Sequence, residues 1–572
     1  MVYEQSHPAL KYIDPGIPLD IIEEKARAHF PFPSANPGQM EAIVEAIDAY
    51  VNKRKKHVII EAPTGVGKSL IGITIHLVLR ELALEQNPVG QFRTTISTPT
   101  KGLQDQYAKE DCVSMAILKG KKNYRCLVNS DIYYNSIPCR MQCKDQMCSP
   151  RRCPYVSARN LWCNIADLRC TNSAMLVEMC TSLCMMPGNR ADFLILDECH
   201  KMPNTLLDHT IMAYDRRMLK GLETLPGGKD IIEGVEFILK YTSEYQLGVL
   251  YTLDSTLTNL FPLLLEQVEN LLEVLDEWME REDLTDVQMM RLADMVDTLH
   301  NLSDYCGIMD NTQAKTFIVH EKEEGMITFK AVLPADVSEF GMFRKADYYL
   351  HMSATICGIP SYAHTLGIRS DDYHAIQVAN PIPIDNRRIN YLPVMKVANR
   401  LEDFEYKRLV ESIDDIIEHH EGQNGIIHTV SYERAEKMQQ YSRFRQNIVV
   451  PRTRKALLES LDNAMRNKRQ IIIASPAMVE GYDFKGDLSR FQIIMKVPYS
   501  FLGDPLVAHV NKIDPSAYFR EAILSIVQMA GRSVRGVDDH ADTYIIDSSF
   551  EMLLERNGSF FPSWFVDALF EI

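Results

Sequence analysis

The chain has 572 residues, which is enough for roughly three to four domains with sizeable cores. Its composition, 46% hydrophobic and 24% charged, is that of a globular protein, and no apolar run approaches the roughly 20 residues of a membrane helix. The net charge of −16 argues against a protein that coats nucleic acid indiscriminately, but it leaves room for a local basic track.

The first residues lack the basic and then apolar layout of a secretory signal, so we expect a cytoplasmic protein with no membrane partner. Thiols stay reduced in the cytoplasm. The chain has 13 cysteines, most of them between Cys126 and Cys184. We therefore expect this cluster to bind a metal rather than to form disulfides.

A phosphate-binding loop is predicted between a strand and a helix. The β-branched run Val58–Ile60 predicts a buried strand, the letters APTGVGKS follow it, and an apolar helical pattern begins at Leu70. Glycines let backbone N–H groups turn toward phosphates, and the helix directs its positive end at them. Lys68 would reach the β- and γ-phosphates and Ser69 would hold Mg²⁺. The expected nucleotide contacts are Thr64, Gly65, Val66, Gly67, Lys68 and Ser69.

Gln39 stands at the start of a predicted helix that precedes this strand. A glutamine placed there can read the edge of adenine through its two-sided amide. The alternative is an ordinary surface glutamine.

Two segments after the loop could contact nucleic acid. Residues 94–100 predict a strand that ends in small hydroxyls, which suit sugar-phosphate contacts, although an ordinary loop is the alternative. Between Lys119 and Arg159 there are nine basic residues and two acidic ones. A basic track of this kind indicates a phosphate partner, and a solvated face that binds nothing is the alternative.

The cysteine-rich segment has no CxxC pair, which speaks against the common zinc-ribbon spacing. Thiolates four or five residues apart in an irregular segment could still surround Zn²⁺ or an iron–sulfur cluster, and spacing does not choose between the two metals. The cysteines at issue are Cys126, Cys139, Cys143, Cys148 and Cys153.

Residues 190–204 predict an apolar strand that ends in the letters DECH. A carboxylate at the end of a strand beside a phosphate-binding loop can hold Mg²⁺, and the next one can orient the attacking water in phosphoryl transfer. These roles fall to Asp197 and Glu198.

Residues 205–330 have helical spacing with acidic residues on the other face, and they predict a helical insert that packs on itself. The end of this segment resembles a hairpin that returns into the first domain. Residues 345–358 predict a further buried strand with Ser353 and Thr355 at its end, and the prolines of residues 380–388 predict a domain linker.

From about residue 389 a second α/β pattern runs, with four β-branched strands between helical stretches. The letters SIVQMAGRSVRG predict a helix that places Gln528, Arg532 and Arg535 on one face. Two guanidinium groups without matching carboxylates suit a phosphate partner, and solvent-exposed arginines are the alternative.

Along the chain the following segments occur in this order: APTGVGKS, TPTKGLQDQY, LKGKKNYRC, CPYVSAR, DECH, HMSATI, VEGYDFKGD, VPYSFLGDPLV and QMAGRSVRG. With these segments in this order, the chain resembles the XPD/DinG branch of superfamily 2 DNA helicases. The resemblance covers nearly the whole chain. It implies an α/β fold of two RecA-like motor domains, with a cysteine-rich iron–sulfur insert and a helical Arch insert in the first. Residues 1–110, 169–205 and 331–385 would form the first motor, 111–168 the iron–sulfur domain, 206–330 the Arch and 386–572 the second motor.

The resemblance also implies roles for individual residues. ATP and Mg²⁺ would lie between the motors, with Lys68, Ser69, Asp197 and Glu198 on one side and Arg532 and Arg535 on the other. Arg532 would be the arginine finger, while Gln528, Gly481 and Asp483 would couple nucleotide state to motor closure, and Ser353 and Thr355 would link hydrolysis to DNA movement. A 4Fe–4S cluster would be held by Cys126, Cys143, Cys148 and Cys153, with Cys139 as a substitute.

The leading hypothesis is an ATP-dependent helicase, acting as a monomer, that moves 5′→3′ on single-stranded DNA and unwinds tailed or forked duplexes. A metal-stabilised, DNA-stimulated ATPase that acts as a binding switch without processive unwinding is the second hypothesis. A nuclease of the same family is a third, but no carboxylate cluster outside DECH has convincing two-metal spacing. Nothing in the sequence identifies a protein that would load the helicase.

Overall fold

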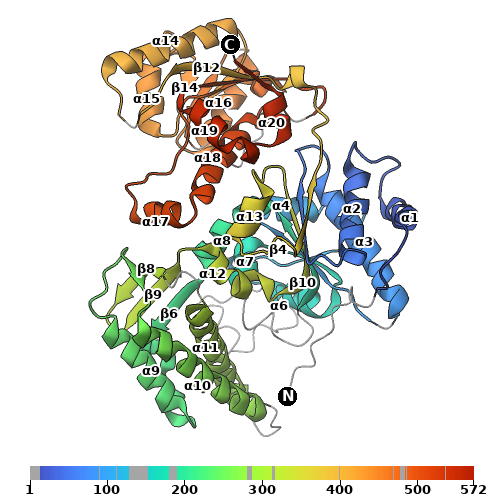
Figure 1. The fold of residues 1–572 in the computed structure, drawn as a ribbon, viewed down its shortest axis with the longest axis vertical. Helices are drawn as coiled ribbons and strands as arrows, with labels where there is room; N and C mark the ends of the chain where they lie inside the picture. The colour runs from blue at the N-terminus through green and yellow to red at the C-terminus, as the bar shows by residue number, and fades with distance from the viewer. Residues whose placement is uncertain are drawn as a thin grey trace.

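The described residues form two parallel sheets and one smaller antiparallel sheet, with helices packed against them (Figure 1). None of the helices in the described ranges combines the length and the apolar character needed to cross a bilayer. The computed structural model describes residues 13–88, 90–110, 112–127, 153–178, 190–279, 286–311, 316–398, 400–467, 469–476, 484, 486–534 and 536–571.

The first sheet has seven strands in the order β11-β1-β10-β5-β2-β4-β3, and its neighbouring strands are parallel. The strands predicted near residues 58, 94, 190 and 345 are confirmed as β1, β2, β5 and β10. Their bounds are β1 His57–Glu61, β2 Thr94–Thr98, β3 Ala116–Ile117, β4 Leu168–Asn172, β5 Ala191–Asp197, β10 Ala346–Ser353 and β11 Tyr373–Gln377.

Helices cover both faces of this sheet, which is why β1 is apolar without alternation. Val58 and Ile60 pack into the core under α1 to α3, and Ile59 packs into the core on the opposite face. The helices are α1 Leu19–His29, α2 Gln39–Val51, α3 Lys68–Gln86, α4 Lys101–Tyr107, α6 Pro154–Asn160, α7 Ser173–Glu178, α8 Met202–His209, α12 Pro334–Ser338 and α13 Ile359–Thr365.

The strand register brings three motifs to one edge of the sheet. Glu61 at the end of β1 lies opposite Ser353 of β10, and Asp197 at the end of β5 lies opposite Met352. Because parallel strands share their carboxyl edge, the phosphate-binding loop, the DECH carboxylates and the residues after Ser353 leave the sheet side by side. Ligands of open α/β sheets bind at this edge.

The insert between β5 and β10 contains the expected helices and the expected hairpin, and in addition the strands β6 and β7, which the sequence analysis did not predict. Its sheet runs β6-β9-β8-β7 and is antiparallel. The hairpin β8–β9 was expected to return into the first domain, but it forms the centre of this separate sheet, where β9 pairs with β6 and β8 pairs with β7. The elements are β6 Ile211–Asp215, α9 Gly228–Tyr241, β7 Leu250–Thr252, α10 Ser255–Met279, α11 Asp286–Asn311, β8 Thr316–Glu323 and β9 Met326–Ala331.

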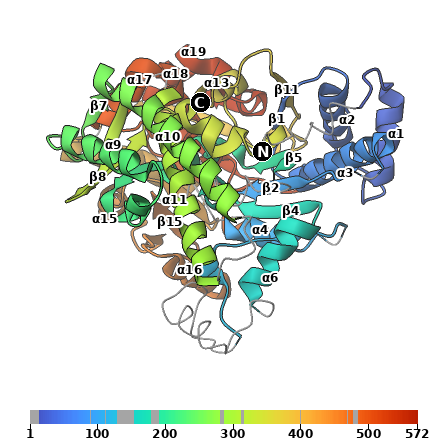
Figure 2. The same ribbon diagram turned by 90° about the horizontal axis from the view of Figure 1, so that it is seen from below.

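The helical spacing predicted within the insert is correct where its side chains are described. Val268, Leu271, Leu272 and Leu275 of α10 are all buried. α10 lies side by side with α11, as both views of the ribbon show (Figures 1 and 2). The insert core is continuous with one face of the first sheet.

The second sheet has seven parallel strands in the order β14-β15-β13-β16-β17-β12-β18. The four strands predicted from β-branched runs are β13, β15, β16 and β17. The strands are β12 Ile389–Met395, β13 Gly425–His428, β14 Ile448–Val449, β15 Ile472–Ser475, β16 Phe491–Ile494, β17 Asp542–Asp547 and β18 Leu569–Glu571. The helices are α14 Asp403–His419, α15 Tyr432–Tyr441, α16 Arg454–Asn467, α17 Pro505–Ile513, α18 Pro515–Ala530, α19 Ser549–Asn557 and α20 Ser563–Asp567.

The two parallel sheets are joined by residues 378–388, which include the predicted linker. The two halves also contact each other through side chains. Ser361 of α13 hydrogen-bonds to Ser516 of α18 at 3.2 Å between the hydroxyl oxygens, and Cys357 is part of the core formed by α18, α19 and α20. The edge of the first sheet therefore faces the second domain, with α18 at the boundary (Figure 1).

Candidate functional site

The phosphate-binding loop has the geometry that its sequence predicts. β1 ends at Glu61, and α3 begins at Lys68. Gly65 and Gly67 both have φ of +88°, a left-handed conformation that favours glycine. A Cβ atom on Gly67 would come within 2.8 Å of the Nε2 atom of Gln39. Glycine is therefore needed here both for the turn and for the close approach of a neighbouring side chain.

The side chain of Gln39 hydrogen-bonds to the backbone of this loop. Its Oε1 atom accepts a hydrogen bond from the backbone N–H of Asn36 at 3.0 Å, and its Nε2 atom donates to the carbonyl of Gly67 at 3.1 Å. Asn36 donates to the carbonyl of Val66 at 3.1 Å. Gln39 is 1% exposed, and both ends of its amide are used by the backbone. Adenine reading by Gln39 stays a prediction, and Asn36 is a supporting residue that sequence reasoning missed.

Asp197 and Glu198 end β5 on the floor of the site, and Glu198 has a left-handed φ of +50°. Burial and the negative charge of Glu198 raise the pKa of Asp197 to about 6, against the opposing influence of Lys68. Burial acts on Glu198 in the same direction, but the positive charge of Lys68 holds its pKa below the ordinary value. The Nζ atom of Lys68 lies 3.9 Å from Oε1 of Glu198. The arrangement concentrates two carboxylates beside one ammonium group.

These groups fit a divalent cation. Asp197 is 6% exposed, and a buried carboxylate with a raised pKa gains from a neighbouring positive charge. Tyr107 of α4 is buried within interaction range of both Ser69 and Asp197, which brings the serine hydroxyl and the carboxylate to one place. Carboxylate and hydroxyl oxygens are the ligands that Mg²⁺ prefers.

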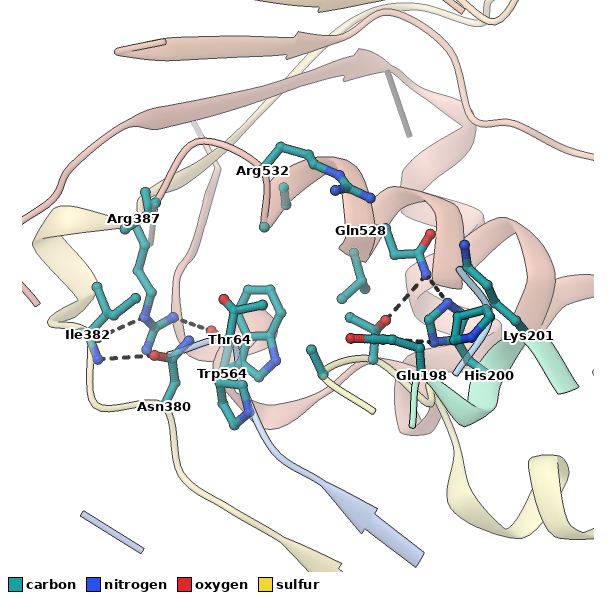
Figure 3. A pocket seen from close by; sticks show the side chains of 18 of the residues that line it. Thr64, Glu198, His200, Lys201, Asn380, Ile382, Arg387, Gln528, Arg532 and Trp564 are labelled. Carbon is teal, nitrogen blue, oxygen red and sulfur yellow. Dashed lines mark hydrogen bonds and ion pairs between the residues drawn. The ribbon is translucent and has the colours of Figure 1, made fainter. Parts of the chain in front are cut away.

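A chain of hydrogen bonds runs from the second domain to Glu198, and Figure 3 shows its first link, between Gln528 and His200. The side-chain N–H of Gln528 donates to Nε2 of His200 at 2.9 Å and lies 3.4 Å from the Thr355 hydroxyl. His200 must then carry its proton on Nδ1, which lies 2.7 Å from the Ser353 hydroxyl. Ser353 donates to Oε2 of Glu198 at 3.1 Å. The chain joins both domains to a carboxylate of the site.

A cleft of about 290 Å³ lies between the two domains. Its walls include Thr64 of the phosphate-binding loop, Glu198, and from the second domain Gln528 and Arg532. Figure 3 shows Arg532 on the wall opposite Thr64 and Glu198. Cationic, carboxylate and amide groups from two domains thus converge on one space.

The predicted helical face at residues 525–536 is only partly correct. α18 ends at Ala530, and the backbone N–H of Gly531 closes the last turn on Val527, so Arg532 follows the helix rather than lying on it. Arg532 still lines the same cleft as Gln528. Arg535, Gly481 and Asp483 lie outside the described residues.

The cysteine segment is described only at its two ends. Cys139, Cys143 and Cys148 lie outside the described residues, while Cys126 and Cys153 are half-buried. The chain around these two cysteines packs together, because the rings of Tyr124 and Tyr155 meet edge to face at 5.4 Å. Within the described ranges, no three His, Cys, Asp or Glu side chains are grouped to hold a metal.

Comparisons with known proteins agree with this geometry. Residues 413–568 match the helicase C-terminal domain family. The chain is 23% identical over 609 aligned positions to the ATP-dependent DNA helicase YoaA of Haemophilus influenzae, covering 87% of this chain and 89% of that protein. A solved XPD helicase has 14% identity and a TM-score of 0.54 over 95% of this chain and all of its own. A second XPD structure, in the apo form, has 13% identity and a TM-score of 0.51 over 93% of this chain and all of its own.

The fold is that of a two-motor helicase, with two RecA-like domains that enclose a phosphate-binding loop and the DECH carboxylates. Within that class the chain is similar over most of its length to the DNA helicase YoaA, and its fold is similar to that of the solved XPD helicases.

Proposed function

We propose that the protein is an ATP-dependent DNA helicase that moves 5′→3′ on single-stranded DNA and unwinds tailed or forked duplexes. The observation that carries the proposal is the hydrogen-bond chain from Gln528 through His200 and Ser353 to Glu198. It links the second motor to the residue expected to orient the attacking water, so the state of the γ-phosphate and the position of the second motor depend on each other.

Hydrolysis is assigned to residues of the phosphate-binding loop and of the DECH segment in the first motor, and to Arg532 in the second. Lys68 neutralises charge on the β- and γ-phosphates, Glu198 orients the water, and Arg532 stabilises the transferred phosphoryl group from the second motor. Ser69 and Asp197 would hold Mg²⁺, which would supply positive charge to neutralise the phosphates of ATP. The raised pKa of Asp197 and the depressed pKa of Glu198 support different roles for the two carboxylates.

Coupling to movement is assigned to the residues at the boundary of the motors. Gln528 reaches both His200 and Thr355, so its two contacts on the first motor are made or broken together when the cleft opens or closes. Gly481, Asp483 and Arg535 are proposed to complete this boundary. Alternating closure driven by ATP binding and release then moves the two motors along one strand.

We assign a 4Fe–4S cluster to Cys126, Cys143, Cys148 and Cys153, with Cys139 as the substitute ligand. The packing of Tyr124 against Tyr155 supports it, because it draws together the chain beside Cys126 and Cys153. Cys170 is a poor ligand candidate, since it is fully buried in β4 and burial raises its pKa to about 12.

The purified protein is expected to contain about four iron atoms and four acid-labile sulfides per chain. Cys153→Ser should lose both, whereas Cys306→Ser, which changes a buried thiol in α11 of the insert, should keep them. Iron and sulfide analysis with the visible absorption spectrum makes the measurement. Zinc without iron or sulfide would overturn the cluster.

A DNA-stimulated ATPase that acts as a switch without processive unwinding is the second candidate, because the same cleft would serve it. Strand displacement on matched duplexes with either a 5′ or a 3′ single-stranded tail separates the two. We expect ATP-dependent displacement of the 5′-tailed duplex alone. Displacement from the 3′ tail alone would keep the motor but overturn the polarity, and hydrolysis without displacement on either duplex would favour the switch.

A further inference from the structure

Glu61 is a buried carboxylate that the proposed steps of hydrolysis leave unused. It ends β1, directly before the phosphate-binding loop, and its side chain is 4% exposed. Its Oε1 atom accepts hydrogen bonds from the backbone N–H groups of Ile356 at 2.6 Å and Cys357 at 3.0 Å. Its Oε2 atom accepts a hydrogen bond from Nε2 of Gln377 at 3.1 Å. Burying a carboxylate is unfavourable unless donors surround it, so these three contacts account for its place in the core.

The backbone that Glu61 holds is a turn between β10 and α13. Cys357 has a φ of +57° and Gly358 has a φ of +89°, so both lie in the left-handed region. A cysteine keeps this conformation only where its surroundings impose it. The N–H groups of Ile356 and Cys357 are directed at one oxygen of Glu61, which supplies that constraint.

The same turn contacts the second motor. The side chain of Cys357 is fully buried in the core formed by α18, α19 and α20. A Cβ atom on Gly358 would come within 2.8 Å of Cδ1 of Phe560, so the backbone of the turn lies directly against this ring of the second motor. α13 follows the turn and packs against α18 (Figure 1). Glu61 therefore fixes a part of the first motor on which the second motor packs.

This contact is separate from the hydrogen-bond chain that runs through Gln528. That chain ends at Glu198, after β5, whereas Glu61 belongs to β1, the strand that carries the phosphate-binding loop. Glu61 lies opposite Ser353 in the register of β1 and β10, and the N–H of Ala62 donates to the carbonyl of Ser353 at 2.9 Å. A displacement of the loop is therefore passed to the turn through a single side chain and the paired strands.

We propose that Glu61 is a positioning residue that couples the nucleotide state of the phosphate-binding loop to the second motor through the backbone of Ile356 and Cys357. The inference rests on the proposed function, because it requires ATP to bind at the loop and the second motor to respond. Glu61 touches neither the nucleotide nor the DNA. It makes the loop and the turn move together.

The hydrogen-bond pattern around Glu61 supplies a sharp test. All three partners are donors, so the position requires a group that only accepts. In Glu61→Gln the amide N–H groups face either the backbone donors or Gln377, and at least one contact then pairs two donors. The exchange variant E61Q/Q377E restores the order, because the oxygen of the new amide faces the backbone and its N–H groups face the new carboxylate. Residue 377 is exposed, so a carboxylate there stays hydrated.

The measurement is the coupling between nucleotide binding and DNA binding in the full-length protein. Fluorescence anisotropy gives the dissociation constant of a labelled single-stranded oligonucleotide with and without a saturating non-hydrolysable ATP analogue and Mg²⁺. The ratio of the two constants is the coupling factor, and we expect about 5 to 150 for the wild-type protein. Glu61→Gln should lower this factor about tenfold, or to 1 where the wild-type value is smaller, because a hydrogen bond to a charged group contributes about this much. E61Q/Q377E should recover it.

Two more variants separate coupling from stability. Asp414→Asn makes the same chemical change in α14, at a buried carboxylate that accepts from the backbone N–H of Arg443 at 2.8 Å. It should lower the Tm and leave the coupling factor unchanged. Glu61→Asp keeps a buried carboxylate, which protects folding, but it shortens the side chain by about 1.5 Å. The backbone donors then lie beyond hydrogen-bonding distance, and the coupling factor should fall.

The outcomes separate this inference from the proposed function. If the coupling factor of the wild-type protein is 1, nucleotide and DNA bind independently, and both the motor and the role of Glu61 fall. If the wild-type protein shows coupling and the Glu61 variants retain it, the role of Glu61 is overturned and the helicase proposal stands. The role is also overturned if Asp414→Asn loses as much coupling, or if E61Q/Q377E fails to recover it. Loss in Glu61→Gln with recovery in the exchange variant would establish it.

Discussion

Lys68→Ala should abolish ATP hydrolysis and strand displacement together. Lys68 is the cation at the start of α3, and its ammonium group lies 3.9 Å from Glu198, so alanine removes the positive charge beside this carboxylate that we propose binds the phosphates. Removing one preorganised charge-stabilising group costs about 10²–10³ in rate, and loss of the phosphate contact adds to it. Steady-state phosphate release and displacement of a 5′-tailed duplex measure the two activities.

The matched control for this experiment is Lys53→Ala. Lys53 is a solvent-accessible lysine that pairs with Asp48 at 2.8 Å and precedes β1, so it lies at the opposite edge of the sheet from the cleft. Its replacement should leave both activities within about twofold of the wild-type protein, as is usual for a surface ion pair. Strand displacement that survives Lys68→Ala would exclude the ATP-driven motor.

Arg532→Ala is expected to reduce hydrolysis by about 10³–10⁵, the range found for arginine fingers, while nucleotide affinity falls much less. Arg532 comes from the second motor and lines the cleft opposite Glu198 (Figure 3). A guanidinium that stabilises charge only as the phosphoryl group transfers affects kcat more than binding. Single-turnover hydrolysis and equilibrium binding of the ATP analogue separate the two effects.

Two further variants sharpen this result. Arg532→Lys keeps the charge but loses the planar fork, so it should recover only part of the activity. Arg556→Ala, which removes an exposed arginine of α19, should hydrolyse ATP at the wild-type rate. If Arg532→Ala instead lowers affinity and leaves the rate at saturating ATP unchanged, Arg532 binds the ground state and another group acts as the finger.

The phosphate-binding loop could be predicted in detail because its chemistry is local. A β-branched strand, two glycines with positive φ and a helix that begins at Lys68 are all encoded within a short run of residues. The buried strands that carry Asp197 and Ser353 were equally evident, since a strand covered on both faces is a continuous apolar run.

Other features depended on partners distant in the sequence. The insert's hairpin pairs with β6 and β7 rather than with the first sheet, and periodicity alone does not specify which strand a hairpin joins. The amide of Gln39 contacts the backbone of Gly67 because α2 packs against the loop. Arg532 follows α18 because the helix ends at Ala530, and helical spacing alone does not predict where a helix ends.

The sequence by itself determined the two α/β domains with their parallel sheets, the phosphate-binding loop, the position of the DECH carboxylates at a strand end, and which residues we expect to act on ATP. Only the tertiary structure decided how these parts meet. It places Gln528 in contact with both His200 and Thr355, which sets the tautomer of His200. It also places Arg387 against Trp564 at one end of the cleft. Motifs are short because strands and turns are local, whereas a site between two motors is made by side chains that only packing brings within hydrogen-bonding distance.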